Sequence, residues 1–379
     1  MSDPTPDGQP TPRIRLAVVF GGRSTEHAVS CVTAGSVLAA VDRDRYEVVP
    51  IGISREGTWV LAGDDPDKLA ITGRQLPEVE ASGGAAVVLA GDPTNRGLMV
   101  HEPGHVPREL GEVDVVLPLL HGPYGEDGTL QGLFEMAGVP YVGSGVFASA
   151  AAMDKGHMKA LLKAAGLPVG PYAVVTPREW ATDKAAVRET VAALGYPVFV
   201  KPARAGSSVG ITKVHGPDEL DAAVEEARSH DPRVVVEAAV DAREIECGVL
   251  EGIDGQPPDA SVPGEVVVGG GHEFYDFAAK YLPDEGTELV VPADLPDEVA
   301  AEVRDLAVRA FEALSCEGLA RVDLFVGRDG TVLVNEVNTM PGFTPVSMFP
   351  LLWQASGLEY PALVDRLVRT ALAKPPGLR

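Results

Sequence analysis

Short apolar runs that alternate with helical patterns constrain the fold of this chain more than any other feature. Ile14–Phe20 (IRLAVVF) stops at a glycine pair, and Val113–Leu120 stops at His121-Gly122. Uninterrupted apolar runs of this length are typical of parallel strands that are buried on both faces. Because helical patterns separate these runs, residues 13–143 are predicted to form an α/β layer around a parallel sheet.

The chain is too long for a single core. It has 379 residues, and a domain has roughly 150, so two or three domains are expected. The pattern changes near Gly143, where the α/β layer gives way to a βαβ-like unit and then to further strands. We predict a disordered N-terminus (1–12), an N-terminal α/β domain (13–143), a central lobe (144–236) and a C-terminal lobe (237–379).

Local patterns add two expectations about these parts. Residues 63–112 are rich in glycine, proline and aspartate, which predicts a loosely organised insertion, with edge strands left open. Helices are predicted at Ala148–Gly166, which ends just before Pro168, and at Trp180–Leu194.

Composition excludes several classes of partner. The chain has 31 basic and 55 acidic residues, a net charge of −24, and no run of lysine or arginine. Phosphate backbones and anionic lipids repel such a chain, so neither nucleic acid nor a membrane is expected as a partner. Three widely spaced cysteines argue against a disulfide framework or structural zinc. Met1–Arg13 lacks the apolar segment of a signal peptide, so a cytoplasmic location is expected.

The strongest pattern of chemistry-bearing residues lies in a predicted hairpin that turns at Asp329-Gly330. Strand side chains alternate between faces, so Asp323, Glu336 and Asn338 would converge if the register agrees, with Arg321 beside them. Oxygen ligands of this kind suit Mg²⁺. A hairpin with a solvated polar face is the alternative. The opposite face is predicted to be apolar, with Val322, Leu324, Val326, Leu333 and Val337.

A second pattern surrounds the end of the predicted strand Val198–Pro202. This strand delivers Lys201, and the loop Ala203–Ser208 then offers backbone N–H groups and hydroxyls that can cradle a phosphate. It is not a P-loop, because GxxxxGK[ST] is absent and a strand follows instead of a helix. An ordinary flexible hairpin loop is the alternative.

Other candidate binding residues follow the strands of the N-terminal layer. Ligands in open α/β sheets bind beyond the carboxyl ends of strands, where Glu26, His121 and Glu126 are placed. A helix-dipole role for Glu26 and a capping or packing role for His121 are the alternatives. Gly143–Ala148 matches GxGxxA, but it lacks the acidic partner of a dinucleotide site and is interpreted as a tight turn.

An aromatic loop near residues 269–286 suits a lid that closes over a site and excludes water. A surface loop packed by its own aromatic side chains is the alternative.

Taken together, six segments resemble one family. They are FGGRSTEHAVS (20–30), LHGPYGEDGTLQG (120–132), YVGSGVFASAAAMDK (141–155), VKPARAGSSVG (200–210), FYDFAAKYL (274–282), and RVDLFV with VNEVNTMPGFTPVSMFP (321–350). In this order the chain resembles the D-alanine–D-alanine ligases of the ATP-grasp superfamily, from about residue 14 to about residue 373. The resemblance implies an α/β fold in which a pre-ATP-grasp domain with a parallel sheet precedes a two-lobed ATP-grasp fold.

The resemblance also implies an activity. Members of this family join two D-alanines through a D-alanyl phosphate, use ATP and two Mg²⁺ or Mn²⁺ ions per site, and supply peptidoglycan synthesis. A homodimer is expected on the same ground, and a requirement for K⁺ is left open. The alternatives are a ligase that joins D-alanine to D-serine or D-lactate, a catalytically silent nucleotide-binding module, and an NAD-dependent enzyme using Gly143–Ala148.

The resemblance implies a role for each matching residue. The nucleotide would be bound by Lys155, Lys201, Ser207, Ser208, Glu237, Ala238, Val240, Glu244 and Tyr275, with Glu244 at the ribose. The metal ligands would be Asp323, Glu336 and Asn338. Substrate contacts would come from Glu26, His121, Glu126, Lys280 and Ser347, with Arg321 and the Gly342 N–H at the oxyanion. Ser207, Tyr281 and Glu26 would form a hydrogen-bonded trio.

One position departs from the family pattern. Some members have Arg-Glu after the residue that matches Glu26, whereas this chain has His27-Ala28. The difference is expected to alter the anchoring of the loop or the pKa of Glu26, without affecting the phosphate and metal residues.

The presence of Tyr281 leads to a prediction about the second substrate. Relatives that accept D-lactate lack this tyrosine, so Tyr281→Phe is expected to raise D-lactate use relative to D-alanine. The measurement is the ratio of ester to dipeptide formed at neutral pH, and an unchanged ratio would contradict the specificity argument.

Overall fold

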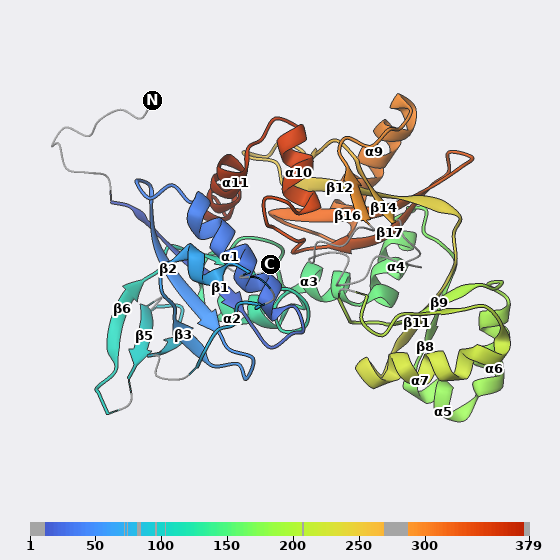
Figure 1. The fold of residues 1–379 in the computed structure, drawn as a ribbon, viewed down its shortest axis with the longest axis horizontal. Helices are drawn as coiled ribbons and strands as arrows, with labels where there is room; N and C mark the ends of the chain where they lie inside the picture. The colour runs from blue at the N-terminus through green and yellow to red at the C-terminus, as the bar shows by residue number, and fades with distance from the viewer. Residues whose placement is uncertain are drawn as a thin grey trace.

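The computed structural model describes residues 12–71, 73, 75–81, 85–94, 97–102, 104–206, 208–268 and 287–374. Strands within these ranges form three sheets with helices packed against them (Figure 1). Of the N-terminus predicted to be disordered (1–12), residues 1–11 lie outside the described ranges. The same holds for Ser207, Tyr275, Lys280, Tyr281 and the loop predicted as a lid.

The predicted parallel strands lie at one side of the first sheet. β1 (Ile14–Gly21) lies between β2 (Tyr46–Ile53) and β7 (Val115–Pro118), and all three run in the same direction. β3 (Trp59–Leu61) precedes the segment predicted to be loosely organised, which adds β4 (Ala86–Leu89), β5 (Gly97–His101) and β6 (Arg108–Glu112). These strands extend the sheet antiparallel beyond β2.

Ser30 ties the carboxyl ends of the two parallel strands β1 and β7 together. It lies in α1 (His27–Ala40), accepts the Gly21 N–H at 2.8 Å, and donates to the Leu119 carbonyl at 2.6 Å. The loops that follow both strands therefore meet at one edge of the sheet. That edge also holds the start of α2 (Thr129–Ala137), and the short 3₁₀ helix η1 (Pro66–Leu69) packs near α1.

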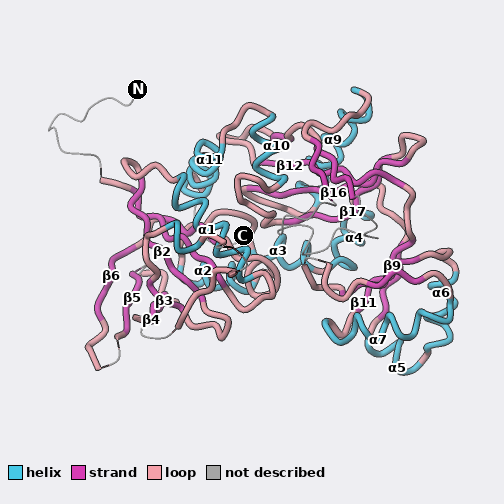
Figure 2. The backbone as a smooth tube through the Cα atoms, viewed as in Figure 1, coloured by secondary structure: helices cyan, strands magenta, loops and turns pink. Residues whose placement is uncertain are grey.

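The two last helices complete the core of the first sheet. α10 (Met348–Ala355) and α11 (Tyr360–Leu372) supply Phe349, Trp353, Leu363 and Leu367 to a buried cluster that also contains Leu16 and Phe20 of β1. Figure 2 shows α11 beside α1, above the N-terminal sheet, with α10 next to α11. The C-terminal part of the chain thus stabilises the N-terminal sheet by covering its apolar face.

The second sheet carries the phosphate-loop candidate. Its strands are β8 (Tyr172–Val175), β9 (Val198–Pro202), β10 (Thr212–Val214) and β11 (Val234–Ala238), in the order β10-β9-β11-β8. α7 (Leu220–His230), preceded by the 3₁₀ helix η2 (Pro217–Glu219), connects β10 to β11. Both strands run antiparallel to β9, which lies between them. The loop after Lys201 is therefore the hairpin turn from β9 to β10.

Two predicted helices are each divided by an aspartate. The prediction of one helix at Ala148–Gly166 is wrong, because α3 (Val146–Met153) and α4 (Lys155–Ala164) are separated at Asp154, whose carboxylate caps the His157 N–H. The segment at Trp180–Leu194 likewise divides into α5 (Pro177–Thr182) and α6 (Lys184–Ala192) at Asp183. An aspartate that accepts a hydrogen bond from the backbone two or three residues on favours an N-cap over a helix interior.

The third sheet presents one apolar face and one polar face. Its strands are β12 (Ala242–Leu250), β13 (Asp259–Ala260), β14 (Gly264–Val268), β15 (Thr287–Val290), β16 (Leu319–Gly327) and β17 (Val332–Asn338). α9 (Asp297–Ala313), α3 and α4 share a buried cluster with one face. The other face carries Glu244, Arg321 and Asp323 into a cavity.

A bulge in β17 changes which residues share a face. Asp323 pairs with Glu336 but Leu324 pairs with Val334, so Asn335 is an extra residue. Val332 and Val334 are consequently buried, and Leu333 pairs with Phe325 on the cavity side. The prediction that Leu333 lies on the apolar face is therefore wrong, because strict alternation cannot register an inserted residue. Within the described ranges, no helix is long and apolar enough to cross a membrane.

The shared core of β1 and the last helices gives a testable expectation. Phe349 is fully buried, with its ring centroid 6.0 Å from that of Phe343 and 6.4 Å from that of Trp353. Phe349→Ala is expected to lower the free energy of unfolding by about 3–5 kcal/mol, since it leaves a cavity in this core.

Urea denaturation followed by tryptophan fluorescence measures this change. Met136→Ala, at an exposed side chain of α2, is the control and should leave the midpoint near that of the wild type. A Phe349→Ala midpoint equal to that of the control would contradict the shared core.

Candidate active site

One cavity of about 790 Å³ is lined by strands of the second and third sheets and by α1 and loops that lie outside the strands of the first sheet. It brings together every predicted site residue that the structure describes. These are Glu26, His121, Glu126, Lys155, Lys201, Ser208, Glu237, Ala238, Val240, Glu244, Arg321, Asp323, Glu336, Asn338, Gly342 and Ser347. Segments that lie as far apart in the sequence as Glu26 and Ser347 thus face one another, which is the arrangement expected of a binding site.

The β16–β17 hairpin places the predicted metal ligands opposite one another. Asp323 pairs directly with Glu336, and Arg321 pairs with Asn338. The Arg321 Nε and Nη2 groups donate to the two Asp323 oxygens, each at 2.7 Å, and the Asn338 amide donates to Asp323 Oδ2 at 3.0 Å. The register that the metal prediction required is therefore present.

This oxygen set fits a hard divalent cation. Among the described residues there is no group of three His, Cys, Asp or Glu side chains that suits a metal. The hairpin instead offers two carboxylates and an amide, and a turn of the Asn338 amide would present its oxygen in place of its NH₂ group. Such a set leaves positions for water and phosphate oxygens, as Mg²⁺ sites commonly do.

Arg321 remains charged although it is buried. Burial by itself lowers the pKa of Arg321, but the adjacent Asp323 and Glu246 carboxylates outweigh it and raise that pKa well above its ordinary value. The guanidinium is therefore a fixed positive charge on the cavity wall.

Lys155, Lys201 and Lys213 line the cavity on the other side, and Lys159 adjoins it. Only Lys155 and Lys201 were predicted from the sequence. Lys201 donates to Glu237 Oε2 at 2.9 Å, while the buried Lys159 Nζ lies 3.4 Å from Glu237 Oε1 and donates to the Asn335 carbonyl at 2.9 Å. Lys159 follows Lys155 by four residues, so it lies on the same side of α4. That spacing was the available signal, and it was missed.

The negative charge of Glu237 compensates the positive charges of Lys159 and Lys201. Burial raises the pKa of Glu237, but Lys201 and Lys159 outweigh burial and lower it overall. In turn, Glu237 raises the pKa of Lys201 against the effect of burial. Burial lowers the pKa of Lys159, with Glu237 opposing that shift. The Glu237 carboxylate thus orients the lysines, while Ala238 and Val240 after it also line the cavity.

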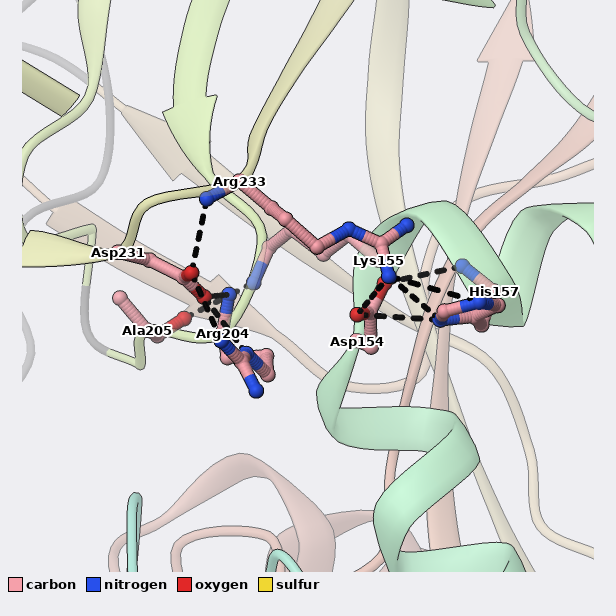
Figure 3. A network of polar contacts seen from close by, with 7 residues as sticks. All are labelled: Asp154, Lys155, His157, Arg204, Ala205, Asp231 and Arg233. Atoms are coloured by element: carbon pink, nitrogen blue, oxygen red, sulfur yellow. Dashed lines mark hydrogen bonds and ion pairs between the residues drawn. The ribbon is translucent and has the colours of Figure 1, made fainter. Parts of the chain in front are cut away.

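A polar network fixes Lys155 beside the loop that follows β9 (Figure 3). Lys155 begins α4, its Nζ donates to the Ala205 carbonyl at 2.9 Å, and the same atom lies 3.8 Å from Glu336 Oε2. Asp231 accepts the Arg204 N–H at 2.9 Å and its Nε–H at 2.8 Å. The start of this loop is therefore held both by Lys155 and by Asp231.

Glu26 lies against this loop from the N-terminal sheet. Its Oε2 would be only 2.6 Å from a Cβ atom at Gly206, so no larger residue fits there without movement. The close approach brings the loop of the central lobe to the edge of the first sheet. Ser207, which follows Gly206, lies outside the described residues.

His121 presents a neutral nitrogen inside the cavity. Burial lowers the pKa of its imidazole, although Glu26 and the bond to Met340 oppose the shift. Its Nδ1 lies 3.1 Å from the Met340 carbonyl. Its Nε2 is buried without a hydrogen-bond partner among the described residues, so it is available to a ligand that donates.

Glu126 is held beside Glu26 as a second carboxyl group. Its Oε1 accepts the Gly122 N–H at 2.7 Å. Burial raises the pKa of Glu126 to about 8, and Glu26 adds to the rise, while the bonds from the backbone and Lys155 oppose it. The side chain is therefore protonated near neutral pH.

His27, the departure from the family pattern, anchors the loop after β1. Its Nε2 accepts the Val79 N–H at 3.0 Å, so Nδ1 carries the proton and donates to the Gly22 carbonyl at 2.7 Å. The residue is fully buried and does not line the cavity. A buried imidazole thus holds the loop that carries Glu26.

Comparison with known proteins identifies the family. The models described as D-ala D-ala ligase N-terminus and D-ala D-ala ligase C-terminus match residues 15–144 and 161–369. The chain belongs to the D-alanine–D-alanine ligase family. The D-alanine–D-alanine ligase of Streptomyces coelicolor is 59% identical over 372 residues, which cover 96% of this chain and 95% of the relative. That of Kineococcus radiotolerans is 61% identical over 375 residues, covering 97% and 99%.

Solved structures of D-alanine ligases share the fold. The VanG D-Ala:D-Ser ligase from Enterococcus faecalis has a TM-score of 0.82 at 35% identity, covering 95% of this chain and all of that one. The D-alanine–D-alanine ligase from Coxiella burnetii has a TM-score of 0.79 at 34% identity, covering 95% and 94%. The predicted α/β, ATP-grasp fold is thereby confirmed.

The raised pKa of Glu126 leads to a prediction about pH. In the unfolded chain Glu126 ionises near 4.5, whereas in the folded chain it does so at about 8. The folded state binds one more proton between these values. The free energy of unfolding therefore falls as pH rises through that window, by at most about 1.4 kcal/mol per pH unit.

Glu126→Gln mimics the protonated group and removes this loss. Its melting temperature, relative to that of the wild type, is expected to rise from about pH 5 to pH 8 and to level off above pH 8. Thermal melts in matched buffers measure the difference, and parallel curves for the two proteins would contradict the predicted protonation.

Proposed function

We propose that this chain joins two D-alanines into D-alanyl-D-alanine with the hydrolysis of ATP to ADP and phosphate, for peptidoglycan synthesis. One observation carries the proposal. A single cavity combines phosphate-binding lysines, a hard-oxygen hairpin and a neutral imidazole, in a chain that is 59–61% identical to proteins named D-alanine–D-alanine ligase.

The lysine side of the cavity would bind the nucleotide. Lys155 and Lys201 would contact the phosphates, and Ser207 and Ser208 would close over them from the loop after β9. Ala238 and Val240 would hold the adenine, and Glu244 the ribose. The position of Lys155 at the N-terminus of a helix supports this assignment, because the helix dipole there also favours an anion.

Asp323, Glu336 and Asn338 would hold Mg²⁺ or Mn²⁺, two ions per site. When bound, the cations would neutralise charge on the phosphates of ATP. The protein's own contribution is to keep two carboxylates paired in register at the floor of the cavity. Lys155, which lies 3.8 Å from Glu336, would then be shared between the metal site and the phosphates.

The imidazole side would bind the amino acids. Glu26 and His121 would hold the first D-alanine, whose ammonium can donate to the unpartnered His121 Nε2. ATP would transfer its terminal phosphoryl group to the carboxylate of this D-alanine, which gives the carboxyl carbon a leaving group. The amine of the second D-alanine would then form the amide bond as phosphate departs.

The oxyanion of that step would lie near Arg321 and the Gly342 N–H. The fixed guanidinium charge supports this role, because preorganised charge stabilises a developing anion without reorganisation. Ser347 would hold the carboxylate of the second D-alanine. In this structure its Oγ lies 2.7 Å from Thr344 Oγ1 and lines the cavity.

D-serine or D-lactate as second substrate remains the alternative. The structural similarity to a D-Ala:D-Ser ligase motivates a direct comparison of the three substrates. A cytoplasmic location, a homodimer, and domain boundaries at 143/144 and 236/237 remain predictions from the sequence.

The proposed function predicts that ADP forms only when D-alanine and Mg²⁺ are both present. Coupled detection of ADP, with the dipeptide identified by mass spectrometry, measures this dependence. Dominant ester or D-Ala-D-Ser formation in competition experiments would instead favour the alternative, and ADP formation without D-alanine would contradict both.

Glu336→Gln is expected to leave the fold intact but to lower kcat at least 100-fold, because the amide carries no charge for the metal. Glu265→Gln is the matched control. It removes a carboxylate from β14 that pairs with Arg243, outside the cavity lining, and should keep the wild-type rate. A folded Glu336→Gln variant with near wild-type turnover would exclude the proposed metal role.

A further inference from the structure

Glu246 is a buried carboxylate in the cavity that has no role so far. It lies on β12, where it pairs with Asp323 of β16, which in turn pairs with Glu336 of β17. The three carboxylates therefore form one row across three adjacent strands. Glu246 is 6% exposed. Like charges opposite one another on a sheet are unfavourable, so this row requires a cation.

In this structure the guanidinium of Arg321 supplies that charge. Its Nε–H donates to Asp323 Oδ1 at 2.7 Å, and Glu246 Oε2 lies only 2.9 Å from the same Nε. One N–H group thus lies within hydrogen-bond distance of an oxygen from each of the two carboxylates.

A cation at the hairpin would compete with Arg321 for Asp323. Both Asp323 oxygens accept from Arg321, and Oδ2 also accepts from Asn338. An oxygen that coordinates a metal gives up some of these bonds. Arg321 would then lose its partner while a second positive charge arrives beside it. Glu246 offers another carboxylate to the same Nε without any movement of the backbone.

We infer that Glu246 is a positioning residue that holds Arg321 in the cavity when Asp323 turns its oxygens to the divalent cation. The inference rests on the proposed function, which gives Asp323 to the metal and Arg321 to the oxyanion. Glu246 acts through Arg321 and does not contact the cation. It lowers the cost of metal binding and keeps the guanidinium where the tetrahedral oxyanion forms.

The test measures Mn²⁺ binding directly. The Mn²⁺ affinity of the ADP-bound protein is obtained from the electron paramagnetic resonance signal of free Mn²⁺. Glu246→Gln keeps the shape of the side chain but removes its charge, so Arg321 stays on Asp323 and competes with the metal. The affinity is expected to fall at least ten-fold. Glu265→Gln, which neutralises a carboxylate in an arginine pair on the adjacent β14, should leave it unchanged.

A double-mutant cycle separates an effect through Arg321 from direct coordination. In an Arg321→Gln background no guanidinium competes for Asp323, so adding Glu246→Gln is expected to change the Mn²⁺ affinity less than three-fold. An equal ten-fold loss in both backgrounds would make Glu246 a metal ligand and overturn the inference. No loss in either background would overturn it as well.

Kinetics add a readout that a purely structural role would not give. Glu246→Gln is expected to lower kcat more than ten-fold while the KM for ATP changes less than three-fold, because Arg321 acts on the reacting centre. If this variant does not fold, as judged by circular dichroism, Glu246→Asp supplies the test. It keeps the charge, but its side chain is one carbon shorter, so the carboxylate lies further from Arg321 Nε. At least a three-fold loss of Mn²⁺ affinity is expected.

The wild type distinguishes failure of the inference from failure of the proposed function. A wild-type protein that binds Mn²⁺ with ADP and forms D-alanyl-D-alanine, together with an unaffected Glu246→Gln variant, overturns only the inference. A wild-type protein without dipeptide formation overturns the proposed function, whatever the variant shows.

Discussion

The structure depends on the compensation of charge that is buried in one cavity. Glu237 lies between Lys159 and Lys201, and Arg321 lies between Glu246 and Asp323. Removing one partner of such a pair leaves an uncompensated charge at low dielectric, which is strongly destabilising. These groups lie on strands of two different sheets and on α4. The pairing of their charges therefore constrains the relative positions of these elements as much as apolar packing does.

Glu237 and Arg321 are the central groups of these two clusters, and each has two partners of opposite charge. The proposed chemistry requires one partner from each cluster. Lys201 is required by the phosphates and Asp323 by the metal, which would leave Lys159 with Glu237 and Glu246 with Arg321. A cavity organised in this way can accept a charged substrate without exposing an unpaired ion. The net charge of −24 therefore says little about the cavity, because interactions within roughly a Debye length of 8 Å decide what binds there.

Much of the fold was predictable because its signals are local. The runs Ile14–Phe20 and Val113–Leu120 contain strands as expected, since a buried parallel strand requires an uninterrupted apolar run. The helix predicted at Ala148–Gly166 failed because one aspartate that caps a new helix looks like any polar residue on a helix surface. The face of Leu333 was missed because the bulge at Asn335 depends on pairing with β16, which a single strand's sequence does not contain.

By itself, the sequence determined the classes of element and the residue types of the site. Asp323, Glu336 and Asn338 could be singled out because a hairpin turn fixes their approximate register. Only the tertiary structure decided that Lys159 and Glu246 belong to the same cavity. Neither residue lies in a distinctive motif, and each is defined by a partner on another element: Glu237 for Lys159 and Arg321 for Glu246. Such pairs arise from the packing of sheets and helices that are distant in the chain, and no local periodicity encodes them.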